Sequence, residues 1–431
     1  MLSILQCMDC GQQYPIDRII YNCDFCGGLL DVLHDPEYLR KTISTELFDN
    51  RLGTQLAPYN SGVWRYKEMI YPDIASNLVV SKSEGNTNLY AAPKLANSIG
   101  VKELFLKHEG ENPTGSFKDR GMTSGITQAQ QLGITRVACA STGNTSASLA
   151  SYAAYADMEG IVFFQNKQIA TGKLAQAIAY GATCVQIDAD FDRNLELVRE
   201  IANVLQIYVL NSVNPFRLEG QKSIIIETLH QLRWEAPDWI VFPGGNLGNS
   251  AAFGKALHEL CEIGIIDRVP RIAIIQAEGA NPLFRSYQDK FRSMYPIHAE
   301  TIATAIKIGN PVNFKKAVRT LNWTNGIVEQ VSDQEIMDAK AIIDQNGIGC
   351  EPASACSLAG IQKLVQTGII KSNDRVVGVL TGHVLKDTDA IINYHQGTLK
   401  NISPTYRNNL LQSEANIKSL SDILKARPKN D

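Results

Sequence analysis

The sequence predicts an α/β protein built on open, mainly parallel sheets, with a zinc-ribbon-like segment at its N-terminus. From about residue 100 onward, short apolar runs alternate with helical patterns, and this alternation favours parallel sheets. Glycine-rich turns follow several of the apolar runs, at the places where such sheets bind ligands. Four of the nine cysteines fall within the first 26 residues. These three observations together define the expected fold class.

Length and charge limit the class of function. The chain has 431 residues, with 41 Lys and Arg against 44 Asp and Glu, so its net charge is −3. At roughly 150 residues per domain, two or three domains are expected. No excess of cations is available to neutralise phosphates, which argues against a nucleic-acid or membrane-surface binder. No apolar run has the length of a membrane span, and no signal-peptide pattern is visible. We therefore expect a cytoplasmic enzyme.

The N-terminal cysteines have the spacing of a metal site. Cys7, Cys10, Cys23 and Cys26 form two C-x2-C pairs separated by twelve residues, and a glycine follows each pair. Two such knuckles can place four thiolates tetrahedrally around Zn²⁺, and an all-sulfur ligand set indicates a structural site. The alternative is a reduced or disulfide-linked hairpin without metal. In a chain that we expect to be cytoplasmic, zinc is favoured.

The elements follow from the apolar runs and the patterns between them. The expected strands lie at 104–107, 137–140, 161–164, 183–187, 208–210, 240–242, 272–276 and 376–380. The expected helices lie at 145–155, 172–180, 191–204, 220–232 and 249–261.

One glycine-rich loop follows the strand expected at 240–242. It reads Pro-Gly-Gly-Asn-Leu-Gly-Asn and leads into a helix. Glycines let the backbone approach a phosphate closely, and the helix N-terminus offers free N–H groups and its dipole. The loop is neither GxGxxG nor a Walker loop, so a dinucleotide or nucleoside triphosphate is not favoured. An ordinary strand-to-helix turn is the alternative.

Two other loops carry polar groups that suit recognition or catalysis. Residues 141–146 are rich in hydroxyls and amides, although simple N-capping of the next helix would explain them too. Lys118 falls in the first turn of an expected helix, where the dipole repels a cation. The same field would lower the pKa of its amine, as a Schiff-base lysine needs. A solvated surface lysine is the alternative for this position.

Taken together, these segments resemble the threonine synthase family of fold type II pyridoxal-phosphate-dependent enzymes, which are related to the tryptophan synthase β subunit. The resemblance covers roughly residues 60–395, and the cofactor-lysine motif is shared with relatives such as threonine dehydratase. The stretch Thr381-Gly382-His383, followed by Leu385-Lys386-Asp387, is the most specific to the family. The matching segments are 84–87, 112–121, 141–145, 211–217, 244–249, 350–354 and 381–383.

The resemblance implies how the chain is divided. We expect a zinc-ribbon-like segment at 1–34, a large pyridoxal-phosphate-binding α/β domain at 35–135 and 216–400, and a tail at 401–431. Residues 136–215 would form a small mobile α/β subdomain that closes over the substrate.

The resemblance also implies roles for individual residues. Lys118 would form a Schiff base with pyridoxal 5′-phosphate and then transfer protons. Asn144 would bond the 3-hydroxyl of the cofactor ring, and Thr381 would face its pyridine nitrogen. Arg217 has a planar guanidinium that suits bidentate hydrogen bonds to a phosphate. A structural ion pair is the alternative role for this residue. The cofactor phosphate would be held by Gly245, Asn246, Leu247, Gly248 and Asn249, and the substrate phosphate by Thr145, Ser212, Arg217 and Asn246.

The implied activity is that of a lyase in threonine biosynthesis. Phosphate would be eliminated from Cγ of O-phospho-L-homoserine and water added at Cβ, giving L-threonine and inorganic phosphate. The alternatives are a related lyase such as a threonine or serine dehydratase, and a non-catalytic sensor that binds the cofactor or an amino acid. A homodimer is the default assembly, with no nucleic-acid or membrane partner. Asn88, Val384 and Thr388 depart from the family pattern and bear on substrate fit.

Overall fold

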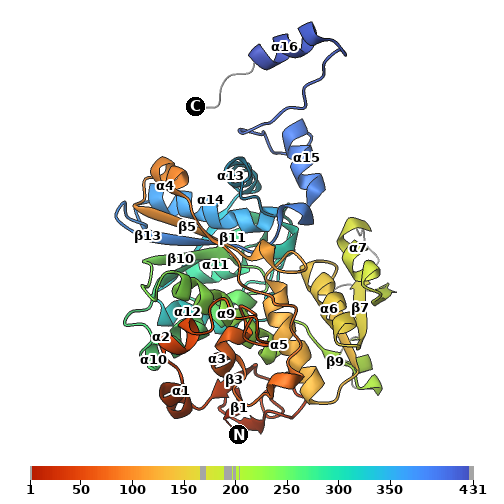
Figure 1. Cartoon of the computed structure of the whole chain (residues 1–431), viewed down its shortest axis with the longest axis vertical. Coiled ribbons are helices and arrows are strands. Elements are labelled where there is room, and N and C mark those ends of the chain that lie inside the picture. The colour runs from red at the N-terminus through yellow and green to blue at the C-terminus, as the bar shows by residue number, and fades with distance from the viewer. Residues whose placement is uncertain (1, 166–170, 189–196, 198–199, 203, 427–431) are drawn as a thin grey trace.

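The computed structural model has two parallel sheets side by side and a small antiparallel sheet at the N-terminus (Figure 1). It describes residues 2–165, 171–188, 197, 200–202 and 204–426. Side chains 165 and 171–173 are outside this description. The mixed α/β architecture with mainly parallel sheets confirms the predicted fold class.

The larger sheet has six strands in the order β12-β11-β10-β13-β5-β4, and only the β4–β5 pair is antiparallel. Its central strand β10 is an uninterrupted buried apolar run, as a parallel strand covered on both faces requires. Ile240 and Phe242 face the core formed with α9 and α10, whereas Trp239 and Val241 face the core formed with α13 and α14. The strands are β4 (Leu89–Ala91), β5 (Glu103–His108), β10 (Trp239–Pro243), β11 (Arg271–Ala277), β12 (Ile327–Val331) and β13 (Arg375–Leu380).

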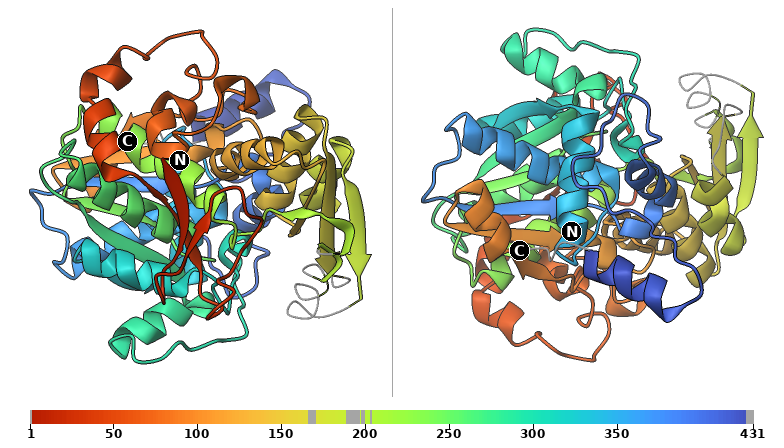
Figure 2. Two further views of the ribbon diagram at one scale, coloured as in Figure 1. Left: turned by 90° about the horizontal axis from the view of Figure 1, so that it is seen from below. Right: turned by 90° about the horizontal axis from the view of Figure 1, so that it is seen from above.

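The smaller sheet lies at one side of the molecule, beside the larger sheet (Figure 2). Its four strands run in parallel in the order β8-β7-β6-β9. Val137 and Cys139 of β6 pack against Leu149 and Tyr152 of α6, and against Met122 of α5. The elements are β6 (Arg136–Ala140), α6 (Asn144–Tyr155), β7 (Glu159–Gln165), α7 (Thr171–Ala179), β8 (Thr183–Ile187) and β9 (Tyr208–Val209). The division of the chain at 135 and 216 stays a prediction.

The N-terminal segment forms an antiparallel sheet in the order β2-β1-β3, with β1 at Ser3–Cys7, β2 at Gln13–Pro15 and β3 at Leu30–His34. Leu5, Leu30 and Val32 are buried in the same core as α9 and α10. His34 Nε2 lies 3.0 Å from a carboxylate oxygen of Glu219, and both side chains are almost fully buried. The segment is therefore part of the main core and not an appended module.

The remaining helices cover the sheets and extend to the C-terminus. Helix α13 begins with a capping box between Ser332 and Glu335, and α14 has Pro352 at its first position. Beyond α15 the chain leaves the body, and the last described element is α16 (Figure 1). These helices are α1 (Pro36–Thr42), α2 (Thr45–Asp49), α3 (Lys67–Ile70), α4 (Pro93–Ile99), α5 (Lys118–Gln131), α9 (Pro215–Gln231), α10 (Gly248–Glu262), α11 (Pro282–Gln288), α12 (Phe314–Trp323), α13 (Asp333–Gln345), α14 (Pro352–Gln366), α15 (Thr388–Gln396) and α16 (Ile417–Ala426).

All eight predicted strands are present within two residues of their expected ends. Helix α9 begins at Pro215 and not at 220, because Asn214 caps it and proline occupies its first position. The helix expected at 191–204 lies largely outside the described residues. Strand β12 and helices α12, α13 and α14 are among the elements that were not predicted from the sequence.

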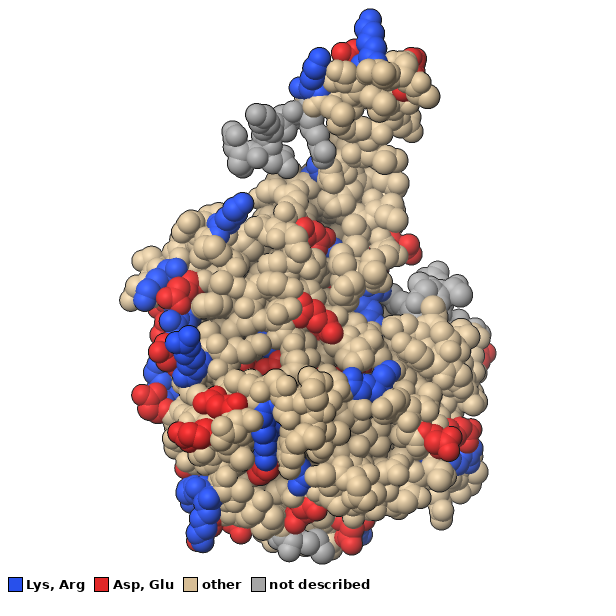
Figure 3. Space-filling view, in the orientation of Figure 1, with Lys and Arg blue, Asp and Glu red and all other residues tan. Residues whose placement is uncertain are grey.

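The exposed charges are mixed in sign. On the face shown in Figure 3, basic and acidic side chains are interspersed. In the part of the chain that the structure describes, no helix combines the length and apolarity that crossing a bilayer requires.

Candidate active site

Four helices begin just after the carboxyl ends of parallel strands. Helix α5 begins at Lys118 after β5, α6 at Asn144 after β6, α9 at Pro215 after β9, and α10 at Gly248 after β10. Helix α5 packs against α6 and α9, and α9 packs against α10. Each helix N-terminus carries a partial positive charge and free N–H groups. The region where these four helices begin therefore favours anionic ligands.

The loop before α5 is fastened to the loop after β13. The Phe117 N–H donates to the Thr381 carbonyl at 3.0 Å, and the His383 N–H donates to the Gly115 carbonyl at 2.9 Å. These bonds link two loops that are more than 260 residues apart in the sequence. They fix the start of α5, and therefore Lys118, beside Thr381.

Lys118 occupies a site that favours its neutral amine. Its Nζ lies 4.0 Å from the centre of the Phe117 ring and has no hydrogen-bond or ion-pair partner among the described residues. Burial of the ammonium and the neighbouring Arg217 cation lower the pKa of Lys118 to about 7, against an opposing effect of Glu351. A substantial fraction of the amine is therefore neutral and available as a nucleophile near neutral pH, unlike in a solvated surface lysine.

Asn144 and Thr381 meet at a third residue, Glu351. The Asn144 Nδ2 donates to the two Glu351 carboxylate oxygens at 3.2 and 3.0 Å. The Thr381 hydroxyl lies 3.5 Å from Glu351 Oε1 and 3.0 Å from the Ser354 hydroxyl. The two residues expected at the polar edges of the cofactor ring are thus in one hydrogen-bonded group.

The sequence motifs assign no role to Glu351, although it lies in the matching segment 350–354. It is the N-cap of α14, yet its side chain does not cap that helix and points into the site instead. Gly382 leaves room for it, because a Cβ at position 382 would come within 2.4 Å of Glu351 Oε1. Burial raises the pKa of Glu351 above its usual value. Only the folded contacts reveal this residue, since its sequence position predicts a helix cap.

The loop at 244–247 presents main-chain donors. Leu247 is left-handed, with φ of 62°, and α10 starts at Gly248 without a side-chain cap. Among the described residues, the N–H groups of Asn246, Leu247, Gly248 and Asn249 have no hydrogen-bond acceptor. At Gly245 an added Cβ would lie 3.0 Å from Ile306 Cα, so this turn is closely packed. The arrangement is that of a phosphate-binding loop.

Asn246 and Ser212 are adjacent, as the resemblance implied. The Asn246 Nδ2 donates to the Ser212 hydroxyl at 3.3 Å, and Asn246 Oδ1 accepts from the Val312 N–H at 2.8 Å. The buried Asn313 then contacts both residues, donating from Nδ2 to the Ser212 carbonyl at 3.1 Å and to the Asn246 carbonyl at 3.4 Å. No sequence motif marks Asn313 as a site residue.

Arg217 is a fully buried cation without a buried anion. Its Nη1 donates to the Leu210 carbonyl at 2.9 Å, but Nε and Nη2 have no partner, and no described carboxylate forms an ion pair with it. Burial lowers the pKa of Arg217 to about 10, so it stays charged at neutral pH. An unpaired buried guanidinium is costly, and an anionic ligand would satisfy it. A structural ion pair, the alternative reading of Arg217, is not found among the described residues.

The structure therefore brings most of the expected residues together. Lys118 and Arg217 lie close enough to influence each other's charge, Ser212 contacts Asn246, and Asn144 joins Thr381 through Glu351. Thr145 follows Asn144 in the first turn of α6.

Two of the three departures from the family pattern have visible contacts. The Asn88 N–H, which a proline would lack, donates to Glu111 at 2.6 Å. Val384 packs against Gly349, where an added Cβ would lie 3.2 Å from the valine. Thr388 is exposed at the first position of α15.

A buried charge cluster supports the start of α5. Arg120, one half-turn beyond Lys118, donates from Nε to Glu109 at 2.6 Å and from Nη2 to Glu227 at 2.8 Å. Lys107 Nζ also lies 2.6 Å from Glu227. The two cations hold the pKa of Glu227 far below its usual range. The cluster joins β5, α5 and α9, which all contribute to the site.

Replacing Glu227 by glutamine is expected to lower the free energy of unfolding by about 3–5 kcal/mol, because it leaves the buried Lys107 without its paired anion and leaves Arg120 with Glu109 alone. The depressed pKa means that this contribution is present above about pH 4.3 and lost as the pH falls below it. Urea unfolding at pH 7 would measure the loss. Glu235→Gln is the control, because the 71% exposed Glu235 pairs only at the surface with Arg375. A loss as small as that of Glu235→Gln would contradict the prediction.

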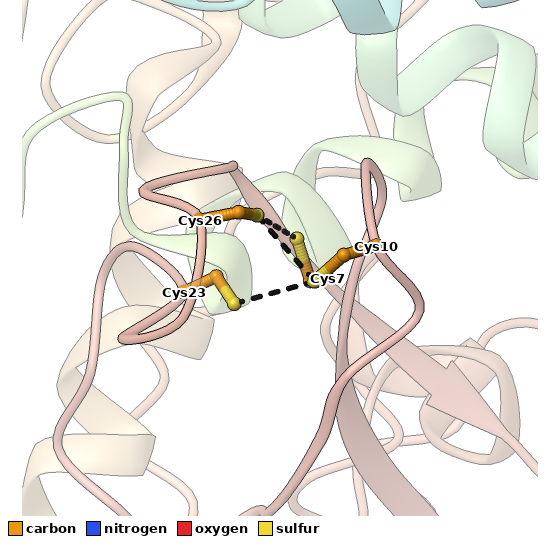
Figure 4. Close-up of side chains that lie close together, drawn as sticks. All are labelled: Cys7, Cys10, Cys23 and Cys26. Carbon is orange, nitrogen blue, oxygen red and sulfur yellow. Dashed lines mark hydrogen bonds between the residues drawn. The ribbon is translucent and has the colours of Figure 1, made fainter.

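The four N-terminal cysteines converge from two loops (Figure 4). Their sulfurs lie within 4.8 Å of one another, and none of the four is in a disulfide. Gly11 and Gly27, the glycines after each pair, have φ of 75° and 72°, which other residues rarely adopt. The cluster has the donor set of a structural zinc site.

The comparisons with known proteins agree with this geometry. Residues 80–382 match the family described as pyridoxal-phosphate dependent enzyme, and the chain belongs to that family. Among solved structures, an L-serine ammonia-lyase from the fungus Rhizomucor miehei resembles the chain with a TM-score of 0.64 and 19% identity. The match covers 73% of this chain and 99% of that one, and it supports the shared fold.

Within that family the chain belongs to the threonine synthases, which are lyases. It is 46% identical to threonine synthase of Methanocaldococcus jannaschii over 92% of this chain and 96% of the relative. It is also 41% identical to the chloroplastic threonine synthase 2 of Arabidopsis thaliana, over 96% of this chain and 82% of the relative.

The residues present fit pyridoxal phosphate. Lys118 offers a partly deprotonated amine, and the loop before α10 offers four free N–H groups to the phosphate. Asn144 and Thr381 supply polar groups beside them, as a ring with a hydroxyl and a nitrogen requires.

Proposed function

We propose that this site converts O-phospho-L-homoserine to L-threonine and inorganic phosphate. The observation that carries the proposal is Arg217, a buried guanidinium with two unpartnered nitrogens close to Lys118. Serine and threonine, the substrates of dehydratases, have no phosphate to satisfy this cation. A phosphorylated amino acid supplies both an amine for the cofactor and an anion for Arg217.

Different residues of the site would bind different parts of the cofactor. Lys118 would bind it covalently through Nζ. The N–H groups of Gly245, Asn246, Leu247, Gly248 and Asn249 would hold its phosphate, Asn144 would bond its 3-hydroxyl, and Thr381 would lie beside its pyridine nitrogen. A neutral threonine hydroxyl there would leave that nitrogen unprotonated. When bound, the cofactor supplies an electron sink for negative charge that develops on the substrate.

Lys118 is the proton-transfer residue in this proposal. Its amine takes the proton from Cα and returns protons at later steps, as the phosphate leaves Cγ and water adds at Cβ. A base is most effective when its pKa lies near the working pH, and a pKa of about 7 meets that requirement. The proposed movement of residues 136–215 would exclude water until the addition step.

The substrate phosphate is assigned to Arg217, Ser212, Thr145 and Asn246. Arg217 offers Nε and Nη2 as two charge-assisted donors, and the Asn246 Nδ2 donates to the neighbouring Ser212 hydroxyl. The N-termini of α6, α9 and α10 add their dipoles to the same anion.

The test is to measure phosphate and threonine formed from O-phospho-L-homoserine by the cofactor-loaded enzyme. Equal amounts of both products would support the proposal. Phosphate without threonine, or turnover of unphosphorylated serine or threonine alone, would point to a related lyase. Bound cofactor without turnover of any amino acid would favour the sensor.

Cofactor binding is expected to report the pKa of Lys118. The rate of covalent attachment to the cofactor-free protein should rise with pH up to about 7 and then level off, because the neutral amine reacts. Absorbance after rapid mixing would measure it, with Nα-acetyl-lysine as the control, whose rate rises until about pH 10.4. In Arg217→Met the midpoint should move to higher pH. A midpoint above pH 9 in the unmodified chain would contradict the assignment.

The proposal also includes a structural Zn²⁺ at Cys7, Cys10, Cys23 and Cys26, and a homodimer in the cytoplasm. The all-sulfur ligand set supports the metal, and twofold dimers are the commonest closed assemblies. Zinc analysis and light scattering of the purified protein would test these two points.

A further inference from the structure

We propose that Asn313 is a positioning residue for the substrate-phosphate loops, and that the zinc-bound cysteine loop acts on those loops through α12. The inference rests on the proposed function, which places the substrate phosphate at Ser212 and Asn246. It adds a connection between two sites that the reaction itself does not require.

The first part of the connection joins the cysteine loops to the start of α12. Asp9, between Cys7 and Cys10, pairs with Lys315 at 2.7 Å. The next residue, Lys316, is almost fully buried and pairs with Asp31 of β3 at 2.8 Å. Its Nζ also donates to the Leu30 carbonyl at 2.7 Å. Two consecutive lysines in the first turn of α12 are therefore held by the N-terminal sheet.

The second part joins the start of α12 to the phosphate loops. Asn313 is the N-cap of α12, and its carbonyl accepts the Ala317 N–H of the first helical turn. Its side chain does not cap the helix but donates to the Ser212 and Asn246 carbonyls. The Asn313 Oδ1 has no partner among the described residues, so the amide acts through these donated bonds.

Helix α12 is packed tightly enough to transmit a displacement. The Thr320 hydroxyl donates to the Ser250 carbonyl of α10 at 2.8 Å. At Gly254 of α10, an added Cβ would lie 2.0 Å from the Thr320 hydroxyl, so the two helices are in close contact. Because packed interiors do not deform smoothly, a shift at Lys315 would move the N-terminus of α12 as a unit.

Zinc would set the position of Asp9. Four thiolates held within 4.8 Å repel one another without a cation, so metal binding orders such loops. Removal of zinc would free the loop that carries Asp9. Asn313 would then lose its fixed relation to Ser212 and Asn246.

The first experiment compares Asn313→Ala with the unaltered chain, both loaded with cofactor and zinc. We expect KM for O-phospho-L-homoserine and Kd for inorganic phosphate to rise about tenfold, a size common for coupling between sites. We expect kcat and the absorbance of the bound cofactor to change little. Lys315→Ala should raise both constants about twofold, because an exposed pair contributes less. Arg18→Ala is the matched control, since Arg18 pairs with the exposed Asp24 inside the ribbon and does not contact α12.

The second experiment removes zinc with a chelator and measures phosphate binding by calorimetry. In the unaltered chain and in Arg18→Ala, we expect Kd for phosphate to rise about tenfold and to recover when zinc is restored. In Asn313→Ala, chelation should add little, because the connection is already broken.

Three results would overturn the proposal. One is purified protein that binds no stoichiometric zinc. Another is an unchanged Kd for phosphate after chelation. The third is an effect of chelation that is equal in Asn313→Ala and in the unaltered chain. Phosphate binding separates this proposal from the proposed function, because it can be measured even if O-phospho-L-homoserine is not turned over.

Discussion

Lys118→Ala is expected to lower the formation of phosphate and threonine by about a thousandfold, since general acid–base catalysis alone commonly contributes 10²–10⁴-fold. The variant would lose the amine that we propose to bind the cofactor covalently, and with it the proposed base for proton transfer. The phosphate loop before α10 remains intact, so the cofactor should still bind without a covalent bond. A coupled phosphate assay and the absorbance spectrum would measure both effects.

Lys94→Ala is the control for this substitution, because Lys94 is exposed on α4, away from the site. Its activity should match that of the unaltered chain. Retention of more than a tenth of the activity by Lys118→Ala would remove Lys118 from the mechanism.

Arg217→Met is expected to affect activity and stability in opposite directions. Two charge-assisted bonds to the substrate phosphate would be lost, each worth about 1.5–3 kcal/mol, so kcat/KM should fall at least a hundredfold. The unfolding temperature should rise, because the substitution removes a buried cation whose Nε and Nη2 have no partner. Kinetics with the phosphorylated substrate and thermal unfolding of the cofactor-free protein would measure the two effects.

Arg136→Met is the matched control, since Arg136 pairs with Glu159 at the surface and both side chains are partly exposed. It should change neither kcat/KM nor stability by much. Arg217→Lys keeps the charge but loses the planar fork, so its kcat/KM should fall between those of the two methionine variants. If Arg217→Met and the unaltered chain unfold at the same temperature, the buried charge of Arg217 is already stabilised in the free protein, and the stability prediction is wrong.

The strands were predictable because each is a short apolar run, and in the larger sheet the central runs are buried on both faces. Strand β10, with all five residues buried, is the clearest case. Strand β12 was missed because Glu329 and Gln330 interrupt its apolar pattern. The sequence marks the true start of α9 by Asn214-Pro215, a cap followed by a first-turn proline. The helix was nevertheless predicted to begin at 220, from its apolar pattern alone.

Site residues could be proposed from the sequence where one short segment carries the relevant groups, as in the loop at 244–249 and the motif around Lys118, and their roles stay predictions. They could not be proposed where a role depends on distant partners. Glu351 reads as a helix cap until the fold brings Asn144 against it. Asn313 reads as the start of a helix until Ser212 and Asn246 are placed beside it. Arg120 and Glu227 are 107 residues apart, and no local pattern connects them.

The position of the N-terminal sheet has a consequence for the order in which the chain can fold during synthesis. The four cysteines lie within twenty residues, so they can gather as soon as that segment leaves the ribosome. The buried lysine that pairs with Asp31 is translated much later, because Lys316 is 286 residues from Leu30, whose carbonyl it also contacts. At about 5–20 residues per second, the segment waits tens of seconds for this partner. Binding of the proposed Zn²⁺ by the four cysteines would hold β1 and β3 together and keep their apolar side chains from aggregating during that interval.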